Sequence, residues 1–383
     1  KSEEERKARK EKKRKLAEAN GQIPIEIRYD SDSSDQGSSG SPKSQASPTI
    51  NPVRIYRRCC QLRETPILKR ITEQLSDPSN FSESTGMVNV LDLSGYGLQM
   101  GDVITLGDYF AVVPIREVLL ADIELSDEGL RLLLAGLLAA KRPDVRRKKP
   151  KHEVEEQGGV IERLVLKGNK FGLNGWKHLS LFLYLCRSLK FLDLSIIPFP
   201  RQVIPRSGTL PNGQQMPRGV ADIFAKSIGD RLGGSTLEVL NISATEPTME
   251  QLGLIMEGVI KCGVRRLGLA LNQLDHQGIE HVTKYIKSGK CEGLDLSGNE
   301  LNWHMETLAF SILESDSLWA LSLANCELQP QSLCRIMPAL SKLANFRFID
   351  LSHNHALFES EPSAVGFLRR YVLLIMVRGE AKS

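Results

Sequence analysis

Apolar and polar residues alternate over a few positions of this chain, and the short alternating pattern returns at a nearly fixed interval. Its clearest copy is residues 294–301, LDLSGNEL. Numbered at their first apolar residue, the copies begin at Leu91, Val118, Leu164, Leu192, Leu240, Leu267, Leu294, Leu321 and Ile349. The successive steps are 27, 46, 28, 48, 27, 27, 27 and 28 residues. Two steps exceed the others by about 20 residues, so we expect one insertion in each.

A period in the high twenties built on LxLxxNxL is typical of a leucine-rich repeat solenoid. In each copy the alternation predicts a short strand with its apolar side chains on one face. The residues that follow predict a helix: Ser126 is a capping residue, and 127–134 bring early acids and then apolar residues at helical spacing. One unit cannot bury its apolar side alone. We therefore predict an α/β solenoid, or horseshoe, with parallel strands on the concave face and helices on the convex face.

Asparagines occupy one position of several copies, where the chain leaves the predicted strand. They are Asn169, Asn272, Asn299 and Asn354, whereas Tyr96, Ile123, Ile197, Thr245 and Cys326 take this position elsewhere. A side-chain amide at such a place can bond backbone groups that have left the sheet. We therefore expect a partial asparagine ladder along the repeats.

The composition changes along the chain and predicts its domain organisation. Residues 1–52 are charged and then serine-rich, and such a segment cannot bury enough surface to offset its ordering entropy. The stretch from Ile55 to Leu75 reads as a single helix that covers the first strand. The predicted parts are a disordered arm (1–52), a helical cap (53–86), about nine repeats (87–375) with insertions near 141–158 and 200–217, and a tail (376–383). A further strand is due near residue 376, so we expect the array to be cut there.

Composition and charge exclude few classes of protein. The chain has 41% apolar and 25% charged residues and a net charge of +4, which is ordinary for a soluble protein. It contains no run of 18 apolar residues, hence no predicted membrane span. The seven cysteines, scattered apart from Cys59-Cys60, form neither a disulfide framework nor a zinc pattern. Reduced thiols and a cytoplasmic location follow as expectations, with the nucleus as the alternative.

Residues that could carry chemistry do not assemble into a recognisable set. Gly95-Tyr96-Gly97 lacks the further glycine of a phosphate-binding loop. His276 and His281 are five apart, which separates them around a helix, and His353 and His355 have no cysteine or carboxylate support. No nucleophile, base and orienting group stand together. We predict a protein that is not an enzyme, with no cofactor, metal or small-molecule substrate.

The concave face is the predicted binding surface for a protein partner, together with the rim loops. Its strand residues that point away from the core, with one turn residue, are Asp92, Glu117, Arg163, Lys167, Phe191, Asp193, Asn241, Arg266, Asp295, Ser322, Phe348 and Asp350. Two interpretations stay open. A crowded parallel sheet requires small solvated residues there, or the row is a docking groove, acidic at its ends and basic near the third and sixth repeats.

Two basic segments and two serines add candidate sites outside the repeats. The basic residues are Lys12, Lys13, Arg14 and Lys15, and Arg146, Arg147, Lys148 and Lys149. They predict nuclear import or contact with an acidic partner such as nucleic acid or tubulin tails, or they are solvated linkers. Ser41 and Ser47 each precede a proline and are phosphorylation candidates in the arm.

Several segments resemble known families. The repeats are similar to the ribonuclease-inhibitor-like superfamily of leucine-rich repeat proteins. Residues 56–62 with 66–75, 169–176 with Gly175-Trp176, and 189–198 resemble protein phosphatase-1 regulatory subunit 37-like proteins. This resemblance implies a regulatory subunit that holds the phosphatase catalytic subunit through a basic-Val-x-Phe segment before the repeats. Here Val53-Arg54-Ile55-Tyr56 lacks both the preceding basic residue and the phenylalanine.

The leading functional hypothesis is therefore a non-enzymatic interaction scaffold or regulatory subunit, with protein phosphatase-1 as the candidate partner. The serine-rich linker and paired insertions also resemble fungal leucine-rich repeat proteins associated with cell-wall biogenesis and microtubules, which is the first alternative. The second is a GTPase activator of the RanGAP type. It is disfavoured because residues 378–383 are not the acidic tail typical of that family.

Overall fold

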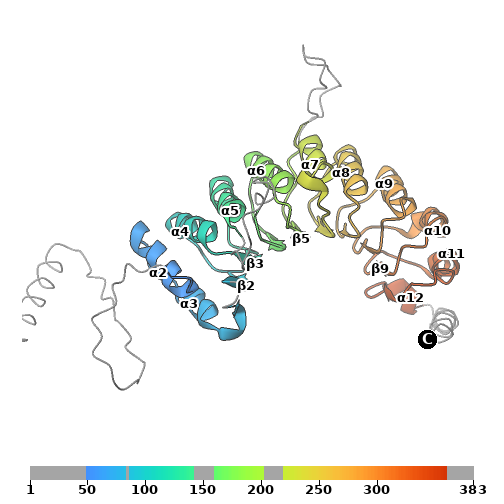
Figure 1. The fold of residues 1–383 in the computed structure, drawn as a ribbon. Helices are drawn as coiled ribbons and strands as arrows, with labels where there is room; N and C mark the ends of the chain where they lie inside the picture. Colours follow the sequence, from blue (N-terminus) through green and yellow to red (C-terminus); the bar gives the residue numbers. More distant parts are fainter. Residues whose placement is uncertain (1–48, 83–85, 142–158, 202–218, 360–383) are drawn as a thin grey trace, which may run out of the picture. The chain divides into compact units, whose positions relative to one another are not determined.

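The computed structural model describes residues 49–82, 86–141, 159–201 and 219–359 (Figure 1). Several predicted features lie outside these ranges. They are the arm up to residue 48, nearly all of both insertions, the tail, both basic segments (Lys12, Lys13, Arg14, Lys15; Arg146, Arg147, Lys148, Lys149) and the phosphorylation candidates Ser41 and Ser47.

The strands of the described residues form one sheet in which they follow sequence order. Strand β1 is antiparallel to β2, and every later pair is parallel. The strands are β1 (Phe81–Ser82), β2 (Met87–Asp92), β3 (Ile115–Leu119), β4 (Arg163–Val165), β5 (Phe191–Asp193), β6 (Val239–Asn241), β7 (Arg266–Gly268), β8 (Gly293–Asp295), β9 (Ala320–Ser322) and β10 (Phe348–Asp350).

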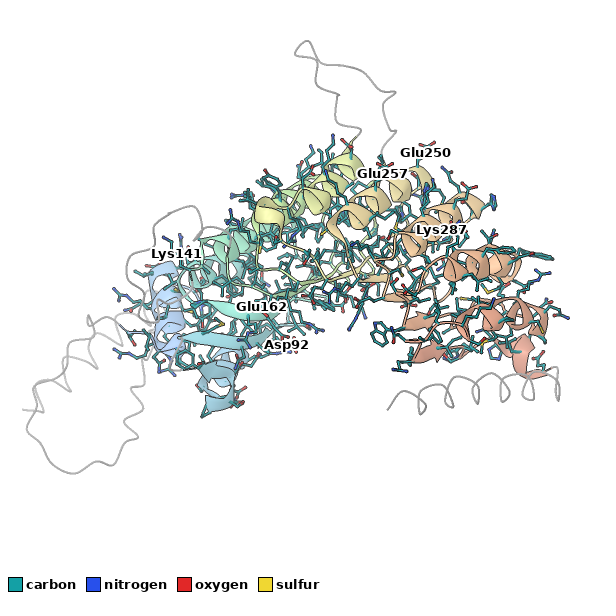
Figure 2. The ribbon with its side chains drawn as sticks, turned by 45° about the vertical axis from the view of Figure 1, so that its right-hand side comes forward. Asp92, Lys141, Glu162, Glu250, Glu257 and Lys287 are labelled. Atoms are coloured by element: carbon teal, nitrogen blue, oxygen red, sulfur yellow. The ribbon has the colours of Figure 1, made fainter. Side chains whose placement is uncertain are left out.

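Helices alternate with these strands along the chain. The described helices pack together on one side of the sheet and leave the other side, the concave face, uncovered (Figure 1). Figure 2 shows Glu250, Glu257 and Lys287 on the helices, and Asp92 and Glu162 beside the strands. The helices are α2 (Pro52–Arg63), α3 (Lys69–Ser76), α4 (Met100–Val112), α5 (Asp127–Ala139), α6 (Leu173–Leu185), α7 (Val220–Gly229), α8 (Met249–Cys262), α9 (His276–Lys287), α10 (Met305–Leu313), α11 (Pro330–Leu340) and α12 (His355–Glu359). The predicted leucine-rich repeat solenoid is confirmed.

The strand register is the predicted one. The nine residues that begin the sequence copies are mutual partners across the sheet, from Leu91 opposite Val118 to Leu321 opposite Ile349. All are buried except Ile349, which is half-buried. The apolar residue of each unit therefore enters one core shared by strands and helices, as a stacked repeat requires.

The N-terminal cap differs from the single helix expected between Ile55 and Leu75. It consists of two helices, α2 and α3, separated by residues 64–68. Glu64 ends α2 in the left-handed conformation, and Pro66 follows two residues later. A proline has no N–H to donate to a helix and disfavours helical geometry in the residue before it, so the helix cannot continue.

The asparagine ladder forms as predicted. Asn169, Asn272, Asn299 and Asn354 are buried, and each joins the turn of its own repeat to that of the preceding one. Two repeats without asparagine replace part of this bonding. Cys326 donates its thiol to the carbonyl of Leu296, and Thr245 donates its hydroxyl to the carbonyl of Ile242.

Candidate functional site

In each strand the two residues on either side of the leading apolar residue (Leu91, Val118 and their partners) lie on the concave face, so stacking sorts the predicted residues into two columns. The strand-start column contains Val90, Glu117, Arg163, Phe191, Val239, Arg266, Gly293, Ala320 and Phe348. The strand-end column contains Asp92, Leu119, Val165, Asp193, Asn241, Gly268, Asp295, Ser322 and Asp350. Lys167 lies outside both columns, exposed in the turn after β4.

This arrangement corrects the expected charge pattern. Arg163 and Arg266 do stand in the third and sixth repeats, but the acids are not confined to the two ends. Asp193 and Asp295 lie in central strands, in the same column as Asp92. The aspartates therefore follow one edge of the strands, whereas the arginines and phenylalanines follow the other edge together with Glu117.

Residues of the strand-end column stabilise the turn that follows the strand. In five repeats the side-chain oxygen of its Asp or Asn accepts a hydrogen bond from the backbone N–H two residues later, at 2.9–3.0 Å: Asp92, Asp193, Asn241, Asp295 and Asp350. The backbone N–H of Ser352 holds the pKa of Asp350 below its usual range. In these five repeats a short polar residue thus stabilises the turn where the strand ends. This supports the structural interpretation for the column.

The strand-start column is built differently, because its arginines stack on aromatic rings. The guanidinium of Arg163 lies 4.1 Å from the ring centre of Phe191, and Nε of Arg163 lies 3.8 Å from a carboxylate oxygen of Glu117. The guanidinium of Arg266 lies 5.0 Å from the ring centre of Trp319. Such contacts hold a long side chain in place and preserve its charge.

Trp319, immediately before β9, is a site residue that the sequence analysis missed. Arg266 extends across Gly293 toward it, since a Cβ on Gly293 would lie 3.3 Å from Cγ of Arg266. The glycine therefore leaves the space in which the arginine lies. A signal for Trp319 exists in the sequence: charged residues occupy the same position in the neighbouring repeats, and an aromatic residue interrupts them.

That position forms a rim column along the start of the strands. Each residue donates its backbone N–H to the carbonyl of the preceding one, in the order Arg116, Glu162, Lys190, Glu238, Arg265, Glu292, Trp319 and Arg347. Charges alternate from Arg116 to Glu292, with ion pairs of 3.7 Å between Lys190 and Glu162 and 3.6 Å between Arg265 and Glu292. Beyond Trp319, Arg347 has no ion pair within the described ranges.

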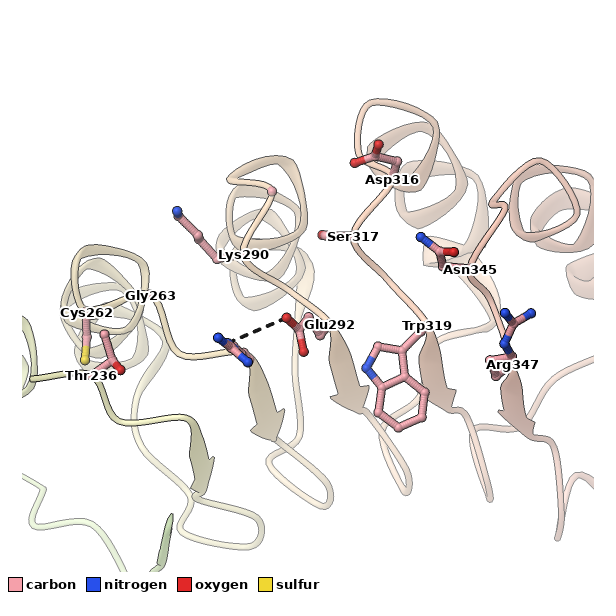
Figure 3. Close-up of a pocket in the computed structure, with 12 residues that line it drawn as sticks. Thr236, Cys262, Gly263, Lys290, Glu292, Asp316, Ser317, Trp319, Asn345 and Arg347 are labelled. Atoms are coloured by element: carbon pink, nitrogen blue, oxygen red, sulfur yellow. Dashed lines mark ion pairs between the residues drawn. The ribbon is translucent and has the colours of Figure 1, made fainter. Parts of the chain in front are cut away.

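A shallow pocket opens at this rim, between the ends of the helices and the starts of the strands (Figure 3). Its volume is about 810 Å³, and its charged and aromatic lining consists of Arg265, Lys290, Glu292, Asp316, Trp319 and Arg347. Trp319 connects the pocket to the concave face, because its ring also contacts Arg266. A lining of bases, acids and one indole suits a polar peptide segment better than a compact apolar ligand.

We call Arg266, Trp319, Arg347 and Phe348 the arginine–aromatic cluster. Phe348 begins β10 and Arg347 immediately precedes it, and Phe348 is 53% exposed although it is large and apolar. Tryptophan and arginine are enriched among residues that dominate binding energy at protein interfaces. Among the described residues, no group of three His, Cys, Asp or Glu side chains is placed to hold a metal ion. Nor do those residues include a helix long and apolar enough to cross a bilayer.

The fold and its repeat chemistry define a leucine-rich repeat protein. More particularly, residues 152–378 match the family described as the MHP1/HER1/GIP3 LRR domain, and the chain belongs to this family. MAP-homologous protein 1 of Saccharomyces cerevisiae is 24% identical over 351 residues, covering 84% of this chain and 23% of the relative. The chain thus spans about a quarter of that relative's length. The resemblance to fungal leucine-rich repeat proteins is confirmed.

Two solved structures also show similarity. The leucine-rich repeat-containing protein LegL7 of Legionella pneumophila has a TM-score of 0.43 and 18% identity, covering 80% of this chain and 95% of its own. The tropomodulin C-terminal domain of Caenorhabditis elegans has a TM-score of 0.34 and 15% identity, covering 41% of this chain and 96% of its own.

Proposed function

We propose that this chain is a non-enzymatic interaction module that holds a protein partner on its concave face, with the arginine–aromatic cluster as the main anchor. Leucine-rich repeat proteins generally act by binding other proteins. The observation that carries the proposal is Trp319, which stands where charged residues occupy neighbouring repeats and which holds Arg266 against its ring.

The cluster favours a partner segment of particular chemistry. Arg266 and Arg347 have no ion pair within the described residues, so both can pair with carboxylates of a partner. Phe348 offers an exposed apolar surface beside them. An acidic segment with at least one apolar side chain fits this combination, because charge then orients the segment and apolar burial adds affinity.

The catalytic subunit of protein phosphatase-1 is the partner to test first, on the strength of the sequence resemblance. Residues 53–56 correspond to the basic-Val-x-Phe docking motif of the phosphatase-1 regulatory subunits, but they do not form an extended segment here. Val53 and Tyr56 lie in helix α2, and Tyr56 is buried against the first repeats. If the phosphatase binds residues 49–359, we expect the concave face to hold it.

The test is a binding measurement with purified phosphatase-1 catalytic subunit and three forms of this chain: native, Trp319→Ser and Trp303→Ser. Trp303 is a matched control, since it is a 75% exposed tryptophan beside helix α10 and away from the cluster. We expect binding by the native chain and Trp303→Ser and at least a tenfold loss with Trp319→Ser. Equal binding by all three would refute the cluster as anchor, and no binding by any would remove this partner.

A cytoskeletal role is the second candidate, favoured by the similarity to a relative named MAP-homologous protein 1. We infer that the basic residues Arg146 to Lys149 would contact acidic tubulin tails. Co-sedimentation with microtubules should then be lost when these four residues become glutamate. If the glutamate variant still co-sediments with microtubules, this segment does not bind them. A parallel Trp319→Ser sample shows whether the concave face contributes.

A further inference from the structure

One turn position adopts the left-handed backbone conformation in all nine repeats. It follows the strand and is occupied by Gly95, Asp122, Gly168, Ile196, Ala244, Leu271, Gly298, Asn325 and His353. Glycine, asparagine and aspartate tolerate this conformation, whereas aliphatic residues are disfavoured by their Cβ, and a β-branched one most of all. Three consecutive repeats nevertheless place aliphatic residues here, with φ of 61° at Ile196, 53° at Ala244 and 56° at Leu271.

These three turns lie side by side. Each backbone N–H donates to a backbone carbonyl of the next repeat: Ile196 to Ser243 at 2.9 Å, Ala244 to Ala270 at 2.7 Å, and Leu271 to Ser297 at 2.8 Å. Leu271 then extends over the turn of the next repeat, since a Cβ on Gly298 would lie only 2.3 Å from its Cδ2. We call Ile196, Ala244 and Leu271 the apolar turn strip.

Neither core packing nor local conformation accounts for the strip. Ile196 is 53% exposed and Leu271 is 54% exposed, so most of the apolar surface that their side chains could bury stays in water. Their backbone conformation is at the same time unfavourable for an aliphatic residue. Unfavourable local geometry that contributes little to the core points to a functional requirement.

Acidic residues outnumber basic ones beside the strip, from the repeat of Ile196 to the repeat that follows Leu271, whereas Lys167 and Lys170 lie exposed in the repeat before Ile196. Asp193 and Asp295 flank it on the concave side and have no ion pair within the described residues. Glu246 and Glu300 flank it on the other side, and Glu246 contacts the exposed Arg201 at 3.6 Å. The whole chain, by contrast, has a net charge of +4. The excess of acidic residues is therefore local, and it is clearest at the Leu271 end of the strip, beside Asp295 and Glu300.

We propose that the apolar turn strip is a second docking surface, which binds a partner segment that presents apolar side chains between basic residues. The backbone N–H groups of the strip are already bonded between repeats, so the segment attaches through side chains and not as an added strand. Adjacent strands are about 4.8 Å apart, which places Ile196 and Leu271 roughly 10 Å apart. Two turns of an α-helix span about 11 Å, so apolar residues seven apart on a basic helix match this spacing.

The strip does not depend on the arginine–aromatic cluster, which lies at the opposite edge of the strands and favours an acidic segment. A peptide of about 18 residues made of lysine and leucine, with leucines at helical spacing, is a direct probe. Its binding to the chain is measured by fluorescence anisotropy near physiological salt, about 0.15 M. A peptide with glutamate in place of lysine tests the charge requirement. It is measured with the Trp319→Ser chain, because the arginine–aromatic cluster of the native chain favours acidic segments, and it is expected not to bind that variant.

The decisive variant carries Ile196→Asn and Leu271→Asn together. Asparagine tolerates the left-handed turn, so we expect an unchanged or higher melting temperature and at least a tenfold loss of affinity for the lysine–leucine peptide. The matched control is Asn325→Leu, which places leucine at the same turn position two repeats beyond Leu271. It should lower the melting temperature and leave peptide affinity unchanged.

Undiminished peptide binding by the double variant would overturn the proposal, as would a native chain that does not bind the peptide. A melting temperature that falls with the double variant would mean that the aliphatic residues stabilise the fold, and would overturn it too. Trp319→Ser, measured in parallel, is expected to retain peptide affinity. The two docking surfaces are thereby tested separately.

Discussion

Replacement of Asn299 by alanine tests how adjacent repeats are held together. The buried amide oxygen accepts hydrogen bonds from the backbone N–H groups of Asn272 and Leu274, both at 3.2 Å. The amide nitrogen donates to the carbonyls of Leu269 at 3.1 Å and Leu296 at 2.8 Å. With a longer bond of 3.4 Å to the carbonyl of Ser297, one side chain thus contacts five backbone groups, drawn from two repeats.

The expected loss of unfolding free energy can be worked out from the backbone groups that lose a hydrogen-bond partner in Asn299→Ala. Alanine leaves two buried N–H donors unsatisfied, each at a cost of about 1–2 kcal/mol. The carbonyl of Leu269 adds a smaller cost, whereas that of Leu296 keeps the thiol of Cys326 as a donor at 3.3 Å. We therefore expect Asn299→Ala to lower the free energy of unfolding by about 3 kcal/mol.

Urea unfolding, followed by circular dichroism, measures this loss against a matched variant. Asn325→Gly removes an exposed asparagine from a turn of the following repeat without straining its left-handed backbone, and should cost less than about 1 kcal/mol. Because repeat arrays do not always unfold in one step, unfolding transitions seen by different probes are compared first. Equal losses for the two variants, within about 0.5 kcal/mol, would refute the role assigned to the buried amide.

Further predictions concern the strand register and pH. Leu296 is fully buried, so Leu296→Ala should lower the free energy of unfolding by about 2–5 kcal/mol. Its neighbour Asp295 faces the concave side but accepts hydrogen bonds from both the N–H and the hydroxyl of Ser297, so Asp295→Ala should cost about 1 kcal/mol, more than an ordinary surface change. Similar losses at both positions in urea titrations would contradict the register. Burial lowers the pKa of His281 and of His304, which also stacks on His276. The unfolded chain therefore takes up protons at a higher pH than the folded one, and stability should fall as pH drops below about 6.5. His281→Gln with His304→Gln should flatten the dependence of melting temperature on pH, and an unchanged slope would show that other groups cause it.

Local patterns predicted the features that repeat along the chain. The position of each strand and the register of Leu91 to Ile349 follow from a short motif in every repeat, and the buried asparagines follow from its fuller form in four of them. The cap was predicted as one helix because its apolar spacing was given more weight than Pro66. In a solenoid every unit contacts only its neighbours, so local sequence is enough to determine the architecture.

The candidate sites depended on contacts between residues that are distant in sequence. Arg266 and Trp319 are brought together across Gly293, and the two columns of the concave face appear only when strands are aligned in register. The left-handed turns of Ile196 and Leu271 leave no periodic apolar signal, because their side chains lie outside the core. Hydrophobic periodicity reports which residues are buried. Which exposed residues become neighbours is decided by the stacking of repeats, and only the tertiary structure contains that information.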